Sequence, residues 1–179
     1  MTWVLVTSNT DKWVEAQRIL GRELVRITLD LPELQAPTTR EVAMEKARAA
    51  FERLRRPVIV EDTGVELAAF GGFPGPFIKH WEKLGGLESL CRALDGTGTR
   101  AATAVCALGV CTSHGAQVVE GRLGGTISQA PRGTNGFGWD AIFVPDGETR
   151  TFGEMTAAEK DACSHRRRAW EALKAAGVE

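Results

Sequence analysis

The sequence lacks several features that would assign it to a class at once. Its net charge is only −1, so it has no basic excess of the kind that nucleic-acid-binding proteins usually carry. It contains no apolar run long enough to span a bilayer, and its first residues lack the basic start of a signal peptide. We therefore expect no nucleic-acid partner, no membrane contact and a cytoplasmic location.

Cysteine is also scarce. The four Cys residues form no Cys-x-x-Cys pair and show no Cys/His spacing of the kind that binds zinc. We expect free, mostly buried thiols in a reducing compartment. Internal repeats, linkers and low-complexity segments are absent, while 43% of the residues are apolar. This composition predicts one domain over residues 1–179, or one domain with two lobes.

Strand and helix patterns alternate in the first third of the chain. Strands are predicted at residues 3–6, 24–29 and 58–60. The first helix is expected to end at Gly21, and the second covers residues 39–56 with Thr39 as its N-cap. This alternation predicts an α/β sheet.

The remainder of the chain predicts a hairpin and several helices. Residues 77–94 are predicted as two helices broken near residues 85–86, and residues 101–111 and 117–127 as an antiparallel hairpin. A short strand at residues 141–144 and a final helix at residues 156–176 follow. Thr156 and Glu159 have the spacing of a capping box at the start of that helix.

Polar residues stand where α/β sheets usually bind ligands. The loop of residues 7–12 joins the first strand to the first helix, so its backbone N–H groups can bind an anion. Glu61 and Asp62 follow a buried strand, and Glu33 lies in a loop after another. Carboxylate oxygens suit Mg²⁺. An ordinary capping turn and solvated loop acids are the alternative interpretations.

A second group of residues is suited to a flat ring. In residues 137–140 two aromatic side chains flank a glycine, and an acid follows. The basic segment at residues 164–168 offers donors, although at helical spacing only His165 and Arg166 are expected to face one pocket. Stacking on the aromatics and donors at the ring edge would suit a nucleotide base. The alternatives are core packing of the aromatics and a solvated basic helix face.

Together these segments resemble the inosine triphosphate pyrophosphatase family. The matching segments occur in the family's order and cover nearly the whole chain: residues 7–12, 31–33, 60–63, 72–79, 130–133, 137–140, 144–147 and 159–166. The resemblance implies an α/β fold with an elongated mixed sheet, flanking helices and two lobes around a central substrate cleft. It also implies a homodimer.

The same resemblance implies an activity. Members hydrolyse deaminated purine nucleoside triphosphates (ITP, dITP and XTP) to the monophosphate and pyrophosphate, with Mg²⁺, or Mn²⁺ in its place. Catalytic roles are implied for Asp62, as the general base, and for Lys12. Metal ligation is implied for Glu33 and Asp62, with Glu61 assisting. Substrate binding is implied for Thr7, Ser8, Asn9, Thr10, Asp11, Lys12, Lys46, Asp62, Thr63, Lys79, Phe137, Gly138, Trp139, Asp140, Lys160, His165 and Arg166.

Three positions depart from the family's pattern. Ser8 replaces a frequent glycine, which puts the geometry of the phosphate loop in question. Asp161 replaces a frequent Asn beside Lys160, and its charge is expected to weaken the hold of that lysine on an anion. His80 follows Lys79 where an aromatic residue is expected.

Two other functions stay open at this point. A Maf-like nucleotide pyrophosphatase for pyrimidine or modified nucleotides usually has a Ser and Arg pattern in its first loop, in place of Thr-x-Asn-x-x-Lys. A nucleotide-binding regulator that has lost hydrolysis would bind the nucleotide without Mg²⁺-dependent release of pyrophosphate.

Overall fold

A computed structural model describes residues 3–32 and 34–177 of the chain. Its described residues form a seven-stranded sheet in the order β2-β1-β3-β5-β6-β7, with β4 pairing to β3. The strands are β1 (Val4–Val6), β2 (Val25–Ile27), β3 (Val58–Leu67), β4 (Pro74–Gly75), β5 (Ala101–Thr112), β6 (Gly115–Ile127) and β7 (Phe143–Pro145). The helices are α1 (Thr10–Leu20), α2 (Thr39–Leu54), α3 (Ile78–Gly85), α4 (Leu87–Ala93), α5 (Ala157–Cys163) and α6 (His165–Ala175). Short 3₁₀ turns occupy Ala68–Phe70, Gly138–Ala141 and Phe152–Glu154.

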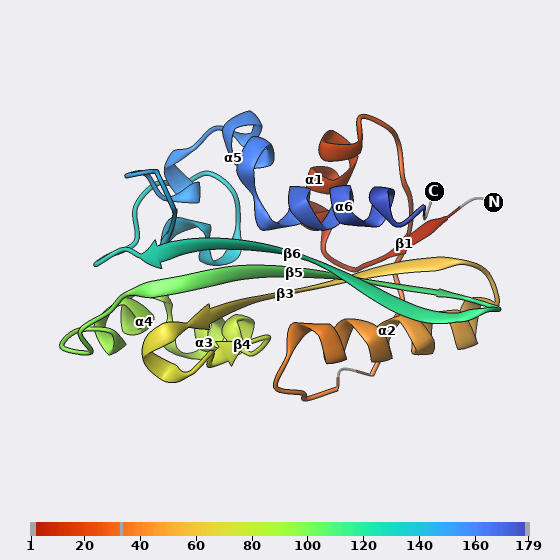
Figure 1. Ribbon diagram of the computed structural model, residues 1–179, viewed down its shortest axis with the longest axis horizontal. Coiled ribbons are helices and arrows are strands. Elements are labelled where there is room, and N and C mark those ends of the chain that lie inside the picture. Colours follow the sequence, from red (N-terminus) through yellow and green to blue (C-terminus); the bar gives the residue numbers. More distant parts are fainter. Residues whose placement is uncertain (1–2, 33, 178–179) are drawn as a thin grey trace.

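The sheet is mixed, as expected. Strand β1 runs parallel to β2 and β3, whereas β3, β5, β6 and β7 pair antiparallel in turn. The three long strands β3, β5 and β6 run along the long axis of the molecule (Figure 1). Helices α1, α5 and α6 lie on one side of the sheet, and α2, α3 and α4 lie on the other (Figure 1). The predicted hairpin is confirmed as β5 and β6.

The hydrophobic core is divided along the length of β3. Val58, Ile59 and Val60 pack in clusters with β1 and the helices α1, α2 and α6. Val65 and Leu67 belong to another cluster, around α3, α4 and β7. The polar part of β3 lies between these apolar segments, so the strand carries polar side chains into the middle of the molecule.

Strand β3 is longer than the sequence predicts. We expected Glu61 and Asp62 to follow the end of a strand at Val60, but both lie inside β3, which continues to Leu67. The cause is tertiary, because β5 pairs with β3 without interruption from Val58 to Leu67. The acids are therefore held by a continuous ladder and not by a loop.

Local capping signals set most of the helix ends. Gly21 ends α1 in a left-handed conformation (φ 65°), as predicted, because glycine adopts this conformation without steric cost. The N-cap of α2 is Thr38 and not Thr39, since Thr38 forms a capping box with Glu41. The capping box of Thr156 and Glu159 is confirmed.

The final helix differs from the prediction. Residues 156–176 form two helices, α5 and α6, because Ser164 between them is extended (φ −65°, ψ 156°). The Ser164 hydroxyl accepts a hydrogen bond from the Arg167 backbone N–H at 3.1 Å and so caps α6. This break places His165 and Arg166 in the first turn of a new helix.

The described residues contain no helix that combines the length and the apolar character needed to cross a membrane. All four cysteines are free thiols and all but Cys163 are buried, so the expected free, mostly buried thiols are confirmed.

Close packing of α6 on β6 depends on Gly121. A Cβ atom at this position would lie 2.1 Å from the carbonyl oxygen of His165 and 2.2 Å from the backbone nitrogen of Ala169. We expect Gly121→Ala to lower the free energy of unfolding in urea by about 2–3 kcal/mol, because neither backbone can yield without moving the helix. Gly124→Ala is the control, since its nearest neighbour is the Asp146 side chain, which can turn away. Equal stability of the two variants would contradict this account.

Candidate active site

A cavity opens beside the middle of β3. Its volume is about 580 Å³. The ladder between β1 and β3 ends at Val60, and the ladder between β4 and β3 begins at Val65. Among the described residues, those at 61–64 therefore have a strand partner only in β5. The cavity lies against this open edge and also meets the loop that follows β1.

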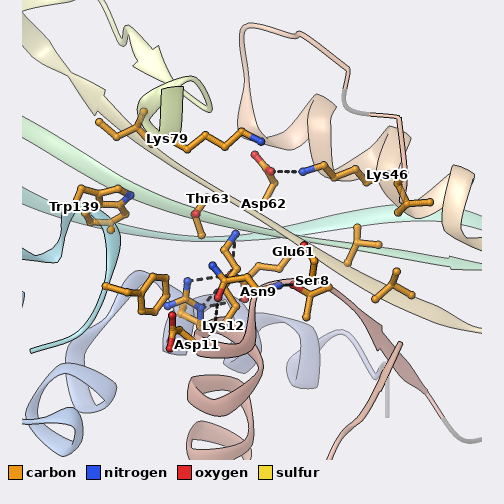
Figure 2. Close-up of a pocket in the computed structure, with 18 of the residues that line it drawn as sticks. Ser8, Asn9, Asp11, Lys12, Lys46, Glu61, Asp62, Thr63, Lys79 and Trp139 are labelled. Carbon is orange, nitrogen blue, oxygen red and sulfur yellow. Dashed lines mark hydrogen bonds and ion pairs between the residues drawn. The ribbon is translucent and has the colours of Figure 1, made fainter. Parts of the chain in front are cut away.

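Glu61 and Asp62 serve opposite faces of the sheet because neighbouring side chains in a strand alternate. The carboxylate of Asp62 accepts a hydrogen bond from the Lys46 ammonium of α2 at 2.7 Å. Glu61 faces α1 and α6 and lies 3.6 Å from the Lys12 ammonium. In Figure 2 Lys46 and Lys79 extend toward Asp62 on one side of the strand, while Lys12 and Glu61 lie on the other.

The loop after β1 is ordered by its own side chains. The hydroxyl of Thr7 accepts from the Asn9 backbone N–H at 3.1 Å, and the Asn9 side-chain oxygen accepts from the Lys12 N–H at 3.0 Å. Asn9 is thus the N-cap of α1, and only its amide NH₂ remains to donate to a ligand. Ser8 needs no glycine-like conformation, because Arg55 is the one non-glycine residue of residues 3–32 and 34–177 with a positive φ.

A buried network of charges lies behind the cavity wall. Arg166 donates through Nε and Nη2 to Glu61 at 3.0–3.1 Å and through Nη1 to Glu15. Lys160 donates to Glu15 at 2.6 Å and to Asp140 at 2.5 Å. All five residues are at most 5% exposed. Each buried charge has an opposite partner, which is the condition under which charges are tolerated in a protein interior.

The network shifts the titration of its members. Burial raises the pKa of Glu15, but the charges of Arg166 and Lys160 outweigh that effect and hold the pKa below its ordinary value. Burial lowers the pKa of Arg166, yet Glu61 and Glu15 reverse this and raise it well above its ordinary value. Burial raises the pKa of Asp140, against the opposing charge of Lys160. Glu15 and Arg166 therefore both keep their charges at neutral pH.

The loop of residues 137–140 borders the same cavity. Its N–H at Phe137 donates to the Asp140 carboxylate at 2.8 Å, and this bond fixes the turn. The ammonium of Lys160 lies 4.7 Å from the centroid of the Phe137 ring, and the Arg166 guanidinium lies 5.5 Å from it. Gly138 has a φ of 61°, which favours glycine. Phe137, Gly138 and Trp139 all line the cavity.

His165 is a neutral imidazole at the cavity wall. Its ring lies 5.1 Å from the Trp139 ring and 6.1 Å from the Phe152 ring, centroid to centroid. Burial lowers the pKa of His165 well below its ordinary value, and the charges of Arg166 and Lys160 add to this. Neither ring nitrogen has a hydrogen-bond partner in the described part of the chain. Both nitrogens are therefore buried polar atoms without a partner among the described residues.

Most of the predicted site residues meet at this cavity. It is lined by Thr7, Ser8, Asn9, Asp11, Lys12, Lys46, Glu61, Asp62, Thr63, Lys79, Phe137, Gly138, Trp139, His165 and Arg166. Thr10, Asp140 and Lys160 do not line it. The Thr10 hydroxyl accepts from Arg26 at 2.7 Å, while Asp140 and Lys160 support the wall from behind. Glu33 lies outside the described residues.

The sequence did not single out Glu15 or Glu82. Glu15 is 3% exposed and joins Arg166 to Lys160, and Glu82 of α3 lines the cavity. One signal for Glu15 was available, since a residue three positions after Lys12 shares its helix face. Nothing in the local sequence pattern distinguishes Glu82 from a solvated acid.

Asp161 forms a salt bridge with α1. Its carboxylate accepts two hydrogen bonds from Arg18 of α1, at 2.6 and 3.3 Å. The partners of Lys160 are instead Glu15 and Asp140. The negative charge of Asp161 is thus compensated by Arg18 of a neighbouring helix. Whether Asp161 weakens the hold of Lys160 on an anion stays a prediction.

In the described part of the chain, no three His, Cys, Asp or Glu side chains lie close enough together to hold a metal ion by themselves. The carboxylate of Asp62 is nevertheless a hard oxygen donor at the cavity wall. It fits a Mg²⁺ ion that takes one or two ligands from protein carboxylates and the others from phosphates and water.

Comparison with known proteins assigns the chain to a family. The model of the Ham1 family matches residues 3–176, which is nearly the whole sequence. The chain belongs to the Ham1 family. It is 41% identical over 175 residues to the dITP/XTP pyrophosphatase of Methanopyrus kandleri, covering 96% of this chain and 93% of that protein. It is 44% identical over 179 residues to the inosine triphosphate pyrophosphatase of Yarrowia lipolytica, covering 97% and 94%.

The fold agrees with this assignment. A Ham1 protein from Coxiella burnetii superposes with a TM-score of 0.86 and 28% identity, and the match covers 99% of each chain. The predicted resemblance and the predicted mixed α/β fold are therefore both confirmed.

The buried neutral state of His165 makes a prediction about stability. Since its pKa is lowered in the folded state, the unfolded chain binds the additional proton below about pH 6.5, and stability falls as the pH falls through that range. Between pH 6.5 and 5.5 we expect His165→Gln to lose about 1 kcal/mol less of its free energy of unfolding than the unmodified protein does. Urea denaturation at each pH measures this difference.

The matched control is His114→Gln in the exposed turn between β5 and β6, which should keep the pH dependence of the unmodified protein. An unchanged pH dependence in His165→Gln would show that the imidazole is not held neutral by the fold.

Proposed function

We propose that this protein hydrolyses deaminated purine nucleoside triphosphates (ITP, dITP and XTP) to the monophosphate and pyrophosphate. It is a pyrophosphate-releasing hydrolase that removes these nucleotides from the pool. One observation supports this above all: a single cavity joins a loop and three lysines suited to phosphates with an aromatic loop and donors suited to a base. The names of its relatives agree with this function and do not favour the Maf-like alternative.

The phosphate end has the groups that the reaction needs. Lys12, Lys46 and Lys79 would stabilise the charge of the leaving pyrophosphate, because phosphoryl transfer is catalysed mainly by positioning and electrostatics. The Asp62 carboxylate would accept a proton from the water that attacks the α-phosphorus. Its ion pair with Lys46 holds the carboxylate in place at the cavity wall.

A divalent cation is part of the proposal. Asp62 and Glu33 would hold Mg²⁺, or Mn²⁺ in its place, and the ion when bound would neutralise phosphate charge and lower the pKa of water. Glu61 is the weaker candidate ligand, because its carboxylate already accepts from Arg166 and lies beside Lys12. We assign Glu61 to the positioning of those two cations.

The base end can distinguish a 6-keto oxygen from a 6-amino group. Three of the five N–H groups of Arg166 are used inside the protein, which leaves two for a ligand. Arg166 has no acceptor, so a 6-amino group facing it would lose a hydrogen bond. A neutral His165 can change its tautomer and serve either group. Arg166 should therefore account for more of the rejection of adenine than His165 does.

Three further statements belong to the proposal. The arrangement in two lobes, the homodimer and the cytoplasmic location are implied by the family resemblance. Four free thiols in the structure support the reducing compartment.

The direct test is pyrophosphate release from ITP, XTP, GTP, ATP and dTTP, with and without Mg²⁺. We expect Mg²⁺-dependent release from ITP and XTP and little from ATP. Preference for a pyrimidine would support the Maf-like alternative, and release of single phosphate would contradict the reaction. Binding of ITP without turnover would indicate a regulator.

Asp62→Asn tests the role of the proposed base. We expect kcat for ITP to fall by roughly 10²–10⁴-fold, because the amide cannot accept the proton, while the Kd for ITP changes little. Asp30→Asn is the matched control, since Asp30 also lines the cavity but has no assigned role. Turnover retained in Asp62→Asn would remove Asp62 from the mechanism as base.

A further inference from the structure

Glu82 is a carboxylate at the cavity wall that the proposed reaction does not use. It comes from α3, and its side chain lies partly buried among residues that line the cavity. In the described part of the chain, this carboxylate forms no hydrogen bond or ion pair. Burial raises its pKa, and the charge of Asp140 raises it further. A partly buried acid that lines a cavity without a protein partner is a candidate contact for a ligand.

The position of Glu82 along α3 identifies which part of a nucleotide it meets. Lys79, three residues earlier, lines the cavity on the same helix face and is one of the proposed phosphate contacts. Three residues of helix advance about 4.5 Å. At the other side, a Cβ atom on Gly138 would lie 3.5 Å from Glu82 Oε2. Glu82 is therefore placed between Lys79, a proposed phosphate contact, and the loop of residues 137–140, which is proposed to hold the base.

The hydrogen-bonding chemistry of a carboxylate also points to the sugar of the nucleotide. An ionised carboxylate only accepts hydrogen bonds, so its partner must be a donor. A phosphate oxygen at this position would be repelled. The sugar lies between phosphate and base in every nucleotide, and its hydroxyls are uncharged donors; carboxylates bind ribose hydroxyls in other nucleotide sites.

The proposed substrates decide between the two hydroxyls. ITP carries hydroxyls at the 2′ and 3′ carbons, whereas dITP carries only the 3′ hydroxyl. Because the proposed activity includes both nucleotides, a contact used by both must be made to the 3′ hydroxyl. We propose that Glu82 binds the 3′ hydroxyl of the substrate sugar and is a specificity-determining residue of this site, an inference that rests on the proposed function.

The experiment compares ITP, 2′-deoxy-ITP (dITP) and 3′-deoxy-ITP. We expect the unmodified protein to show a kcat/KM for 3′-deoxy-ITP roughly tenfold below the values for the other two, as for the loss of one hydrogen bond to a charged group. In Glu82→Leu the preference should disappear, because kcat/KM falls for ITP and 2′-deoxy-ITP while that for 3′-deoxy-ITP stays within about twofold. Unchanged turnover of 3′-deoxy-ITP also shows that the variant is folded.

Two further variants sharpen the comparison. Glu82→Gln keeps an acceptor oxygen and should retain part of the preference, roughly threefold. Glu88→Leu removes an exposed glutamate from the neighbouring helix α4 and should retain all of it. Equal losses for all three nucleotides in Glu82→Leu, or no loss at all, would overturn the assignment. A change in the ratio of ITP to XTP without dependence on the sugar would assign Glu82 to the base and also overturn it.

Failure of the proposed function gives a different result. In that case the unmodified protein releases no pyrophosphate from ITP with Mg²⁺. The Kd values of ITP and 3′-deoxy-ITP, measured by calorimetry with the unmodified protein and Glu82→Leu, then test the sugar contact without turnover. A tenfold difference in Kd that Glu82→Leu removes would support the contact, and equal Kd values in the unmodified protein would refute it.

Discussion

The site depends on a network of five buried charges and the half-buried ammonium of Lys12 beside them. It consists of three acids and three cations: Glu15, Glu61, Asp140, Lys12, Lys160 and Arg166. These six residues come from β3, α1, α5, α6 and the loop of residues 137–140, so one network joins elements that are far apart in the sequence. Removing one partner of such a buried pair typically costs about 3–5 kcal/mol, because the remaining charge is left without compensation. The fold and the site are therefore stabilised by the same contacts.

The network also prepares the cavity for a charged ligand. Arg166 is already oriented by two carboxylates, so its remaining N–H groups would not have to be ordered for the proposed contact with a base. Lys12 lies beside Glu61 in the same way. On the opposite face of β3, Asp62 is ordered by Lys46. Preorganised dipoles and charges of this kind contribute strongly to catalysis, because they need little rearrangement during the reaction.

Local patterns in the sequence predicted much of this molecule. Gly21, the β5–β6 hairpin and the cavity-facing pair of His165 with Arg166 depend on near neighbours or on helical spacing, and all agree with the structure. The break at Ser164 was missed because serine is tolerated inside helices as well as at caps. Glu15 was missed because its partners lie more than 140 residues away, where no periodicity connects them.

The adjacent acids of β3 limit how this strand can evolve. Glu61 and Asp62 have different partners because successive side chains of a strand point to opposite faces of the sheet. An insertion or deletion of one residue between Val60 and Val65 would move side chains to the wrong face and would shift one apolar segment out of its cluster. The number of residues in this stretch is consequently as constrained as their identity, and natural variation should appear there as substitutions and not as changes in length.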